Sequence, residues 1–169
     1  MKKFVIILTI MLGLTQFVSS QKYAFVDTDY ILRNIPAYQA AQEQLNQASK
    51  GWQEEIEAIY QTVAAMYKEY QTESVFLSAE MKTAKEEAII NKEKEAKMLQ
   101  HKYFGPDGEM EKRRSSLIQP IQEQIASVIA EIAKNDGLAA VLDKSSGVLY
   151  LDPKQDYSDQ VLQRLGYKR

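Results

Sequence analysis

The feature that most constrains this chain is a long stretch of helical periodicity in its first half. Apolar residues recur there every three or four positions, a spacing that places them on one face of a single helix. Pro36 stands at a plausible helix start, where its missing N–H costs little. Only Gly51 interrupts the pattern, at a cost of about 1 kcal/mol relative to alanine. The apolar face consists of Tyr38, Ala41, Leu45, Ala48, Trp52, Ile56, Ile59, Val63, Met66 and Tyr70.

A second helix is expected directly after the first. The periodicity stops within residues 74–78, which predicts the tip of a helical hairpin. Ser78 is a good N-cap and Glu80 suits a first helical turn, so we expect a helix over Ala79–Phe104. That helix is thinly apolar and richer in lysine than the first. The unequal charges modestly favour antiparallel packing, although each exposed ion pair adds only about 0.3–0.5 kcal/mol.

A third helical segment follows a short interruption. The sequence Gly105-Pro106-Asp107-Gly108 ends the second helix, and Asp107 can cap the next one. Pro120 predicts either a kink or a late start in that next helix. Asn135-Asp136-Gly137 predicts its end. Its apolar face carries Leu117, Ile121, Ile125, Val128 and Ile132.

Short apolar runs near both ends of the chain predict strands. The run Tyr23–Val26 reads as one buried strand, and Leu138–Leu142 reads as another. A turn at Ser145-Ser146-Gly147 then leads to a third strand at Val148–Leu151. Finally, we expect Ser158 to cap a last helix that extends from Asp159 to Leu165.

These elements define an α+β fold that is mostly α. We expect a small β-strand body from residues 21–36 and 132–169. A long antiparallel, coiled-coil-like helical arm covers residues 37–131, with its tip near 74–78. A helix of about 36 residues is about 55 Å long. Because a two-helix arm of that length lacks a third layer, it must find one in other subunits or in a partner.

The first 20 residues have the composition of a secretory signal peptide. Lys2 and Lys3 precede an apolar run, Phe4–Leu14, that is too short for a good transmembrane helix. We predict cleavage near Ser20, before Gln21, with an uncleaved anchor as the alternative. Removing the two lysines lowers the basic count from 21 to 19 against 23 acidic residues, a net charge of −4. Such an acidic protein gains nothing electrostatically from nucleic acid, which we exclude as a partner.

One short motif suggests catalysis. Asp27-Thr28-Asp29 follows an apolar strand, as does the nucleophile signature of haloacid-dehalogenase-type phosphatases. In the simpler interpretation Asp27 ends a strand and Asp29 is solvated or caps a helix. We favour the second interpretation because no further phosphatase motif follows, and we expect no enzyme. With His101 as the single histidine, no cysteine and no phosphate-binding glycine loop, we also expect no metal and no cofactor.

Two groups of residues on the arm are candidates for binding. The arm carries many aromatic residues, which either pack the hairpin or contact a partner. The tip carries an apolar triplet, which is either a self-packed turn or a contact site. The candidate binding residues are Trp52, Tyr67, Tyr70, Val75, Phe76 and Leu77.

In the order of its parts the chain resembles the Skp/OmpH family. The similarity covers the whole chain after the signal and depends on the combination of segments. The interruption Tyr103-Phe104-Gly105-Pro106-Asp107-Gly108 resembles the subset of this family found in Bacteroidota. The other matching segments are Lys22-Tyr23-Ala24-Phe25-Val26-Asp27, the long helical hairpin, Gly137-Leu138-Ala139-Ala140-Val141-Leu142-Asp143 and Asp159-Gln160-Val161-Leu162.

The resemblance implies a function. The family implies a periplasmic holdase chaperone that binds unfolded outer-membrane proteins without ATP and prevents their aggregation. It implies a homotrimer joined through its strand body, where we expect Phe25, Val26, Val141 and Leu149 to contribute, and only indirect proximity to the membrane. The best-known members are strongly basic, whereas this chain is acidic, so we expect apolar burial to hold the client. A structural coiled-coil protein of the envelope is the alternative.

Overall fold

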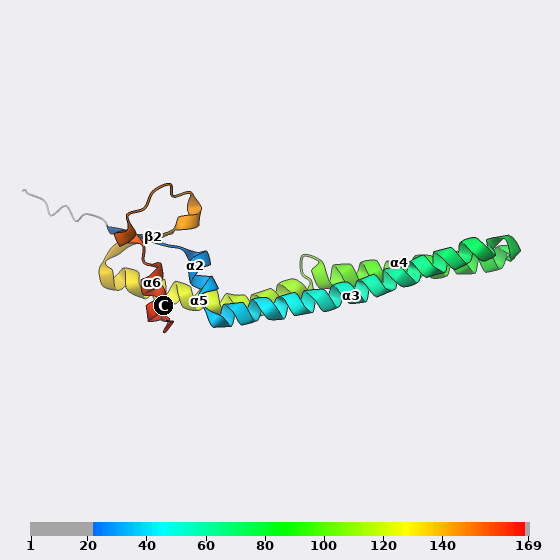
Figure 1. Ribbon diagram of the computed structural model, residues 1–169, viewed down its shortest axis with the longest axis horizontal. Helices are drawn as coiled ribbons and strands as arrows, with labels where there is room; N and C mark the ends of the chain where they lie inside the picture. Colours follow the sequence, from blue (N-terminus) through cyan, green and yellow to red (C-terminus); the bar gives the residue numbers. More distant parts are fainter. Residues whose placement is uncertain (1–21, 168–169) are drawn as a thin grey trace, which may run out of the picture.

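The computed structural model describes residues 22–167 as a small body with one long arm (Figure 1). The predicted signal peptide and its cleavage site near Ser20 lie outside these residues. Within the described range, none of the helices combines the length and the apolar character that crossing a membrane requires. The main elements in chain order are β1 (Lys22–Val26), α2 (Thr28–Arg33), α3 (Pro36–Glu73), α4 (Ala79–Phe104), α5 (Glu109–Asp136), β2 (Leu138–Asp143) and α6 (Ser158–Arg164).

Apolar side chains from both ends of the chain build the core of the body. Ile31 of α2, Ile132 of α5 and Val161 of α6 are at most 2% exposed and belong to one cluster. Burying a side chain of this size stabilises the fold by about 1.5–3 kcal/mol. Ile125 also belongs to this cluster, with Ile121 packed against it. The inner turns of α5, which the sequence analysis assigned to the arm, are therefore part of the core of the body.

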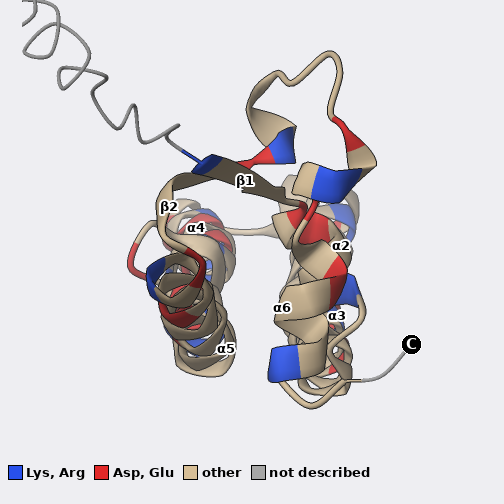
Figure 2. Ribbon diagram, turned by 90° about the vertical axis from the view of Figure 1, so that its left-hand side faces the viewer, with Lys and Arg blue, Asp and Glu red and all other residues tan. Residues whose placement is uncertain are grey.

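The two strands form a parallel pair. Phe25 lies opposite Leu142 in this register. A parallel pair requires a crossover connection, and here the whole arm supplies it. Ala24 and Val26 are buried, so the alternating residues Tyr23 and Phe25 face the other side of the pair. Figure 2, which looks toward the body end, shows both strands lying across one side of the helices.

The predicted third strand at Val148–Leu151 is wrong. This segment has no regular secondary structure. After β2 the chain enters a 3₁₀ turn at Lys144–Ser146 and then passes through Gly147 in the left-handed conformation, with a φ of 90°. That turn directs the apolar segment away from β2, and a second 3₁₀ turn at Pro153–Gln155 follows it. An apolar run alone cannot distinguish a buried strand from an exposed loop.

The arm consists of α3, α4 and the outer part of α5. Pro36 occupies the first turn of α3, as predicted, and the 38 residues of this helix give a length of about 57 Å. The predicted bounds of α4 are confirmed, and the Ser78 hydroxyl accepts a hydrogen bond from the Met81 N–H. A 3₁₀ turn, Ser74–Phe76, forms the tip between the two helices. Past the tip, α4 returns along α3 in the opposite direction (Figure 1).

The interruption after α4 is confirmed, but its details differ from the prediction. Gly108, not Asp107, is the N-cap of α5, and no side chain caps that end. Pro120 lies inside α5, which begins at Glu109, so a late start at the proline is wrong. Gly137 ends α5 in the left-handed conformation, with a φ of 66°. The interruption therefore separates two complete helices that both pack against α3.

The short helix α2 was not predicted, and its capping explains the Asp27 motif. The Asp27 carboxylate accepts a hydrogen bond from the Tyr30 N–H and is the N-cap of α2. Ser158 does not cap the last helix, because the N-cap position belongs to Tyr157. The Ser158 hydroxyl instead accepts a hydrogen bond from the Asp27 N–H at 2.8 Å. The cap of α2 is therefore Asp27, which was expected only to end a strand, and not Asp29, and the Asp27 N–H joins the two ends of the chain through Ser158.

Candidate functional site

The tip of the arm exposes apolar side chains to solvent. Val75 and Phe76 are 78% and 87% exposed, and Leu77 is partly exposed. They lie in or directly after the 3₁₀ turn, which is too short to bury them against its own backbone. Figure 1 shows the turn at the end of the arm farthest from the body, with no other element near it. The tip therefore leaves its apolar side chains exposed and does not bury them in a self-packed turn.

The two candidate tyrosines near the tip participate in polar contacts between α3 and α4. The Tyr70 hydroxyl donates a hydrogen bond to the Glu86 carboxylate, and this bond raises the pKa of Tyr70. The negative charge of Glu93 raises the pKa of Tyr67, whose side chain is 43% exposed. Both rings keep an exposed edge, so these residues join the two helices and still present aromatic surface.

Trp52 lies where the three helices of the arm meet. Its ring stacks on Tyr103 of α4 with centroids 4.8 Å apart and an interplanar angle of 7°. The Phe104 ring meets it edge-on at 6.0 Å. From α5, the Arg113 guanidinium lies 5.6 Å from the Trp52 centroid. We call these four residues the aromatic clasp. Trp52 is half-buried in this clasp, so the structure gives it a packing role within the arm.

The clasp includes one strong polar contact. The Tyr103 hydroxyl donates a hydrogen bond to the Glu55 carboxylate at 2.8 Å, which raises the pKa of Tyr103. Glu55 lies almost one helical turn beyond Trp52 on α3. The Trp52–Tyr103 stacking and the Tyr103–Glu55 hydrogen bond therefore attach the end of α4 to the same short part of α3. The sequence pattern could not reveal this cluster, because its members meet only through the register of the two helices.

The outer arm carries further exposed apolar residues that the sequence analysis did not select as binding candidates. Met81, Ile90 and Met98 of α4 are 52%, 46% and 65% exposed. The adjacent pair Ile89-Ile90 offered one signal, because two successive helical residues cannot both face the partner helix. Ile89 is buried and Ile90 faces outward. The apolar surface of the arm therefore extends beyond the tip along α4.

The four residues predicted for the oligomeric body fall into two groups. Val26 is 4% exposed, and Val141 packs against the same core cluster. Leu149, by contrast, is completely exposed, and Phe25 lies on the outer side of the strand pair. Val26 and Val141 therefore stabilise the chain's own core, whereas Phe25 and Leu149 are available to another molecule.

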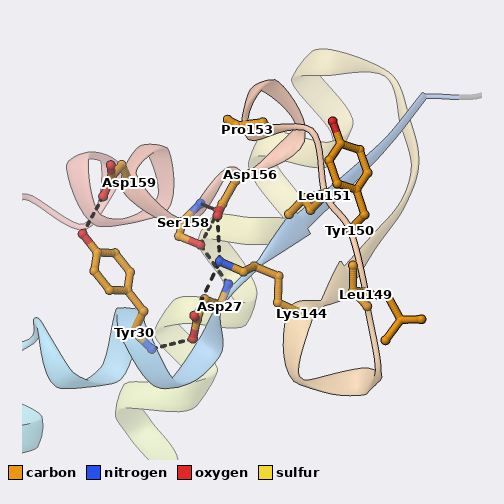
Figure 3. A pocket seen from close by; sticks show the side chains of 11 residues that line it. Asp27, Tyr30, Lys144, Leu149, Tyr150, Leu151, Pro153, Asp156, Ser158 and Asp159 are labelled. Atoms are coloured by element: carbon orange, nitrogen blue, oxygen red, sulfur yellow. Dashed lines mark hydrogen bonds and ion pairs between the residues drawn. The ribbon is translucent and has the colours of Figure 1, made fainter.

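A cavity of about 620 Å³ lies between the loop at Val148–Leu151 and the helices α2 and α6 (Figure 3). Lys144 bridges its polar side, with Nζ 3.0 Å from Asp156 and 3.7 Å from Asp27. The hydrogen bond that Lys144 donates to the Asp156 carboxylate raises the pKa of Lys144. Burial tends to raise the pKa of Asp156, but hydrogen bonds from Ser158 and Lys144 outweigh it, so that pKa is lowered. Asp27 thus takes part in a cap and an ion pair, which suits a structural role.

The second aspartate of that motif does not join the first at this cavity. Asp29 lies exposed in the first turn of α2 and does not line the cavity. His101 is exposed on α4. Within residues 22–167, no group of three acidic or histidine side chains comes together as a metal site would require. The two aspartates of the motif are therefore not brought together at this cavity.

Comparison with known proteins places this architecture in a family. The family model described as outer membrane protein (OmpH-like) matches residues 22–165. The chain belongs to the OmpH-like family. This assignment agrees with the resemblance inferred from the order of strand, hairpin and closing helix.

Two further comparisons show what the chain is similar to. An uncharacterised protein of Aquifex aeolicus is 27% identical over 165 residues, which cover 98% of this chain and 96% of the relative. A crystal structure of an OmpH-like protein from Caulobacter crescentus, a candidate outer membrane chaperone, superposes with a TM-score of 0.69. That comparison covers 89% of this chain and 87% of the other at 11% identity. At such low identity it establishes the shared fold of body and arm.

Proposed function

We propose that this protein is a periplasmic holdase that binds unfolded outer-membrane proteins without ATP and prevents their aggregation. The observation that carries the proposal is the exposed apolar tip at the end of a long arm. Val75 and Phe76 have no role in the fold that would explain their 78% and 87% exposure. Membership of the OmpH-like family and the fold shared with a candidate outer membrane chaperone support the same function.

Apolar burial is the main attraction that we propose for the client. The mature chain carries a net charge of −4 once Lys2 and Lys3 are removed. Charge contacts on an exposed arm are screened beyond about 8 Å at physiological salt. Burial of apolar surface is insensitive to that screening and contributes about 25 cal/mol per Å². Weak, non-directional contacts also suit a client that has no fixed shape.

The first experiment compares two apolar surfaces of the arm. The tip variant replaces Val75, Phe76 and Leu77 with serine, and the matched control replaces Ile90 and Met98 of α4 with serine. Suppression of aggregation of a urea-unfolded outer-membrane barrel is measured across a salt series. We expect wild type to change little with salt and the tip variant to lose most of its holding activity, with circular dichroism unchanged. The control should retain most of it.

Two other results would contradict the proposal. If holding fell steeply with salt while the tip variant behaved as wild type, charge and not the tip would hold the client. If neither wild type nor any variant suppressed aggregation, the alternative of a structural protein of the envelope would be favoured. The interruption between α4 and α5 argues against that alternative, because a rod-like coiled coil needs a continuous apolar seam.

We also propose that three copies associate through the body. The body exposes Leu142, Leu149 and Tyr150, at 46%, 101% and 84%. Apolar residues with this exposure favour association with another surface. The test is mass measurement of the purified mature protein and of a variant that lacks residues 50–113, joined by a short flexible linker. This deletion retains the inner cluster of Ala41, Leu45 and Ile118. Both proteins should be trimers; a folded monomeric truncation would contradict association through the body.

The proposal includes the absence of catalysis at Asp27. Its carboxylate already accepts the Tyr30 N–H and pairs with Lys144. We expect no hydrolysis of an aryl phosphate by the purified protein. Activity that disappeared on Asp27→Asn, with the fold intact, would restore the phosphatase hypothesis.

A further inference from the structure

At one level of the arm, both antiparallel sides contain residues that disfavour a helix. On one side, residues 105–108 separate α4 from α5. On the other side, α3 is continuous but contains Gly51, and glycine is among the residues least suited to a helix interior. Trp52, the next residue, contacts Tyr103 before the interruption and Arg113 after it. The glycine in α3 therefore lies opposite the gap in its partner helices.

The glycines on the two sides have different reasons to be there. A Cβ on Gly108 would approach the carbonyl oxygens of Tyr103 and Lys102 to 2.8 and 2.9 Å, so the close approach of backbone explains that glycine. A Cβ on Gly51 would meet nothing within 4 Å. Packing therefore does not require glycine at position 51. What glycine does provide at this position is a helix that is locally easier to open or bend.

The buried apolar row of the arm is also divided at this level. On the inner side, Ala41 and Leu45 of α3 pack with Ile118 of α5. On the outer side, the next fully buried residue of α3 is Ile56. None of the ten residues between Leu45 and Ile56 is buried. The aromatic clasp spans this level, with Tyr103 buried and Trp52 only half-buried.

We propose that the arm has a joint at Gly51 and residues 105–108, and that the aromatic clasp of Trp52, Tyr103, Phe104 and Arg113 holds it straight. When the clasp opens, the outer arm swings as a unit relative to the inner arm. Sharp helix kinks exceed about 20°, and residue 73 lies about 33 Å beyond Gly51 at 1.5 Å per residue. A swing of that size displaces the tip by about 11 Å. Such a swing would adjust the arm to clients of different size, a consequence that rests on the function proposed above. The joint itself does not depend on that function.

Hydrogen exchange of backbone amides, resolved by mass spectrometry on the full-length mature protein, tests the joint directly. In wild type we expect the amides of residues 48–55 to exchange faster than those of residues 57–66, although both lie inside α3. Gly51→Ala should slow this exchange about fivefold, the factor equivalent to the roughly 1 kcal/mol preference for alanine in a helix. It should also slow exchange at residues 112–116 of α5, whose amides are hydrogen-bonded within the helix and which Gly51 does not touch. Trp52→Ala should accelerate exchange at both places.

The matched control moves a glycine two turns along the same helix. Ala58 is exposed on α3, as Gly51 is. Ala58→Gly should accelerate exchange around residue 58 and leave residues 112–116 unchanged. Uniform protection across residues 45–66 in wild type would overturn the proposal. So would a Gly51→Ala effect confined to α3, or an Ala58→Gly effect that reached α5. Because Gly51→Ala favours the helix, this variant remains informative even if Trp52→Ala fails to fold.

Discussion

The body and the outer arm are stabilised in different ways. In the body, side chains from α2, α5 and α6 interdigitate, and Ile31 is fully buried. In the outer arm only a few apolar residues are buried, and polar contacts such as Lys85 with Glu69 and Glu73 supplement them. A region without its own deep core cannot hide its remaining apolar residues. The arm depends on contacts between neighbouring helices, and the apolar side chains of its tip stay exposed to solvent.

The largest expected effect tests the core of the body. Ile31→Ala removes a side chain of zero exposure and should lower the free energy of unfolding by about 2–5 kcal/mol. Ile89→Ala removes a buried side chain of the outer arm and should cost less, because that arm can loosen without unfolding the body. Urea denaturation followed by circular dichroism at one protein concentration measures both. An equal or larger loss for Ile89→Ala would show that arm and body unfold as one unit.

The next effect concerns the aromatic clasp between the two regions. Trp52→Ala removes a half-buried ring together with its stacking on Tyr103, so we expect a loss of about 1.5–3 kcal/mol in urea denaturation. Trp52→Phe keeps an aromatic ring in the clasp and should lose about half as much. If both variants were as stable as wild type, the Trp52 ring would contribute nothing to the stability of the arm. Its exposed part would then indicate contact with a partner.

Low pH should act mainly on the body. The folded pKa of Asp156 lies below its ordinary value of 3.8 because hydrogen bonds from Ser158 and Lys144 outweigh the effect of burial. The stability that this group contributes is therefore present above about pH 4 and is lost as the pH falls through the folded pKa. Asp156→Asn should be less stable than wild type at neutral pH and show a weaker decline in acid. If the free energy of unfolding fell with pH equally in both proteins, other carboxylates would be responsible for the loss of stability in acid.

High pH should produce the smallest effect, and we expect to observe it in the outer arm. Hydrogen bonds to Glu69 and Glu73 raise the pKa of Lys85 above its ordinary value of 10.5. Its contribution is thus present below that value and is lost as the pH rises through the folded pKa. The raised pKa of Tyr70 acts in the same direction. We expect faster amide exchange in α4 above about pH 10.5, relative to the intrinsic rate, and Lys85→Gln should remove most of this dependence. A change that appeared first in the body would contradict the assignment.

The helices of the arm could be predicted from the sequence because their signals are local. The apolar period, Pro36 and the Ser78 cap each act within one turn, and they set the ends of α3 and α4 closely. The loop at Val148–Leu151 was misread because its conformation depends on the turn before it and not on its own apolar residues. The short helix α2 was not predicted because six residues are too few to show a helical period of apolar residues.

The candidate site was predictable only in part, for a similar reason. The tip follows from the end of a periodic pattern, so Val75, Phe76 and Leu77 were found. Contacts such as Tyr70 with Glu86 depend on the register between two helices, which no local pattern specifies. For the same reason Trp52 was selected as a binding residue although its ring packs on Tyr103.

The parallel pairing of β1 with β2 has a consequence for the order of folding. The two strands are separated by the whole arm, so an unstructured chain would have to close a loop of more than 100 residues to pair them. Formation of α3, α4 and α5 removes most of that entropic cost, because the hairpin returns the chain to its starting point through contacts between adjacent helices. The thinly packed arm is therefore expected to form early, and the tightly packed body last. A φ-value measurement would show high values at Ile56 and Val63 and low values at Val26 and Val161 if assembly follows this order.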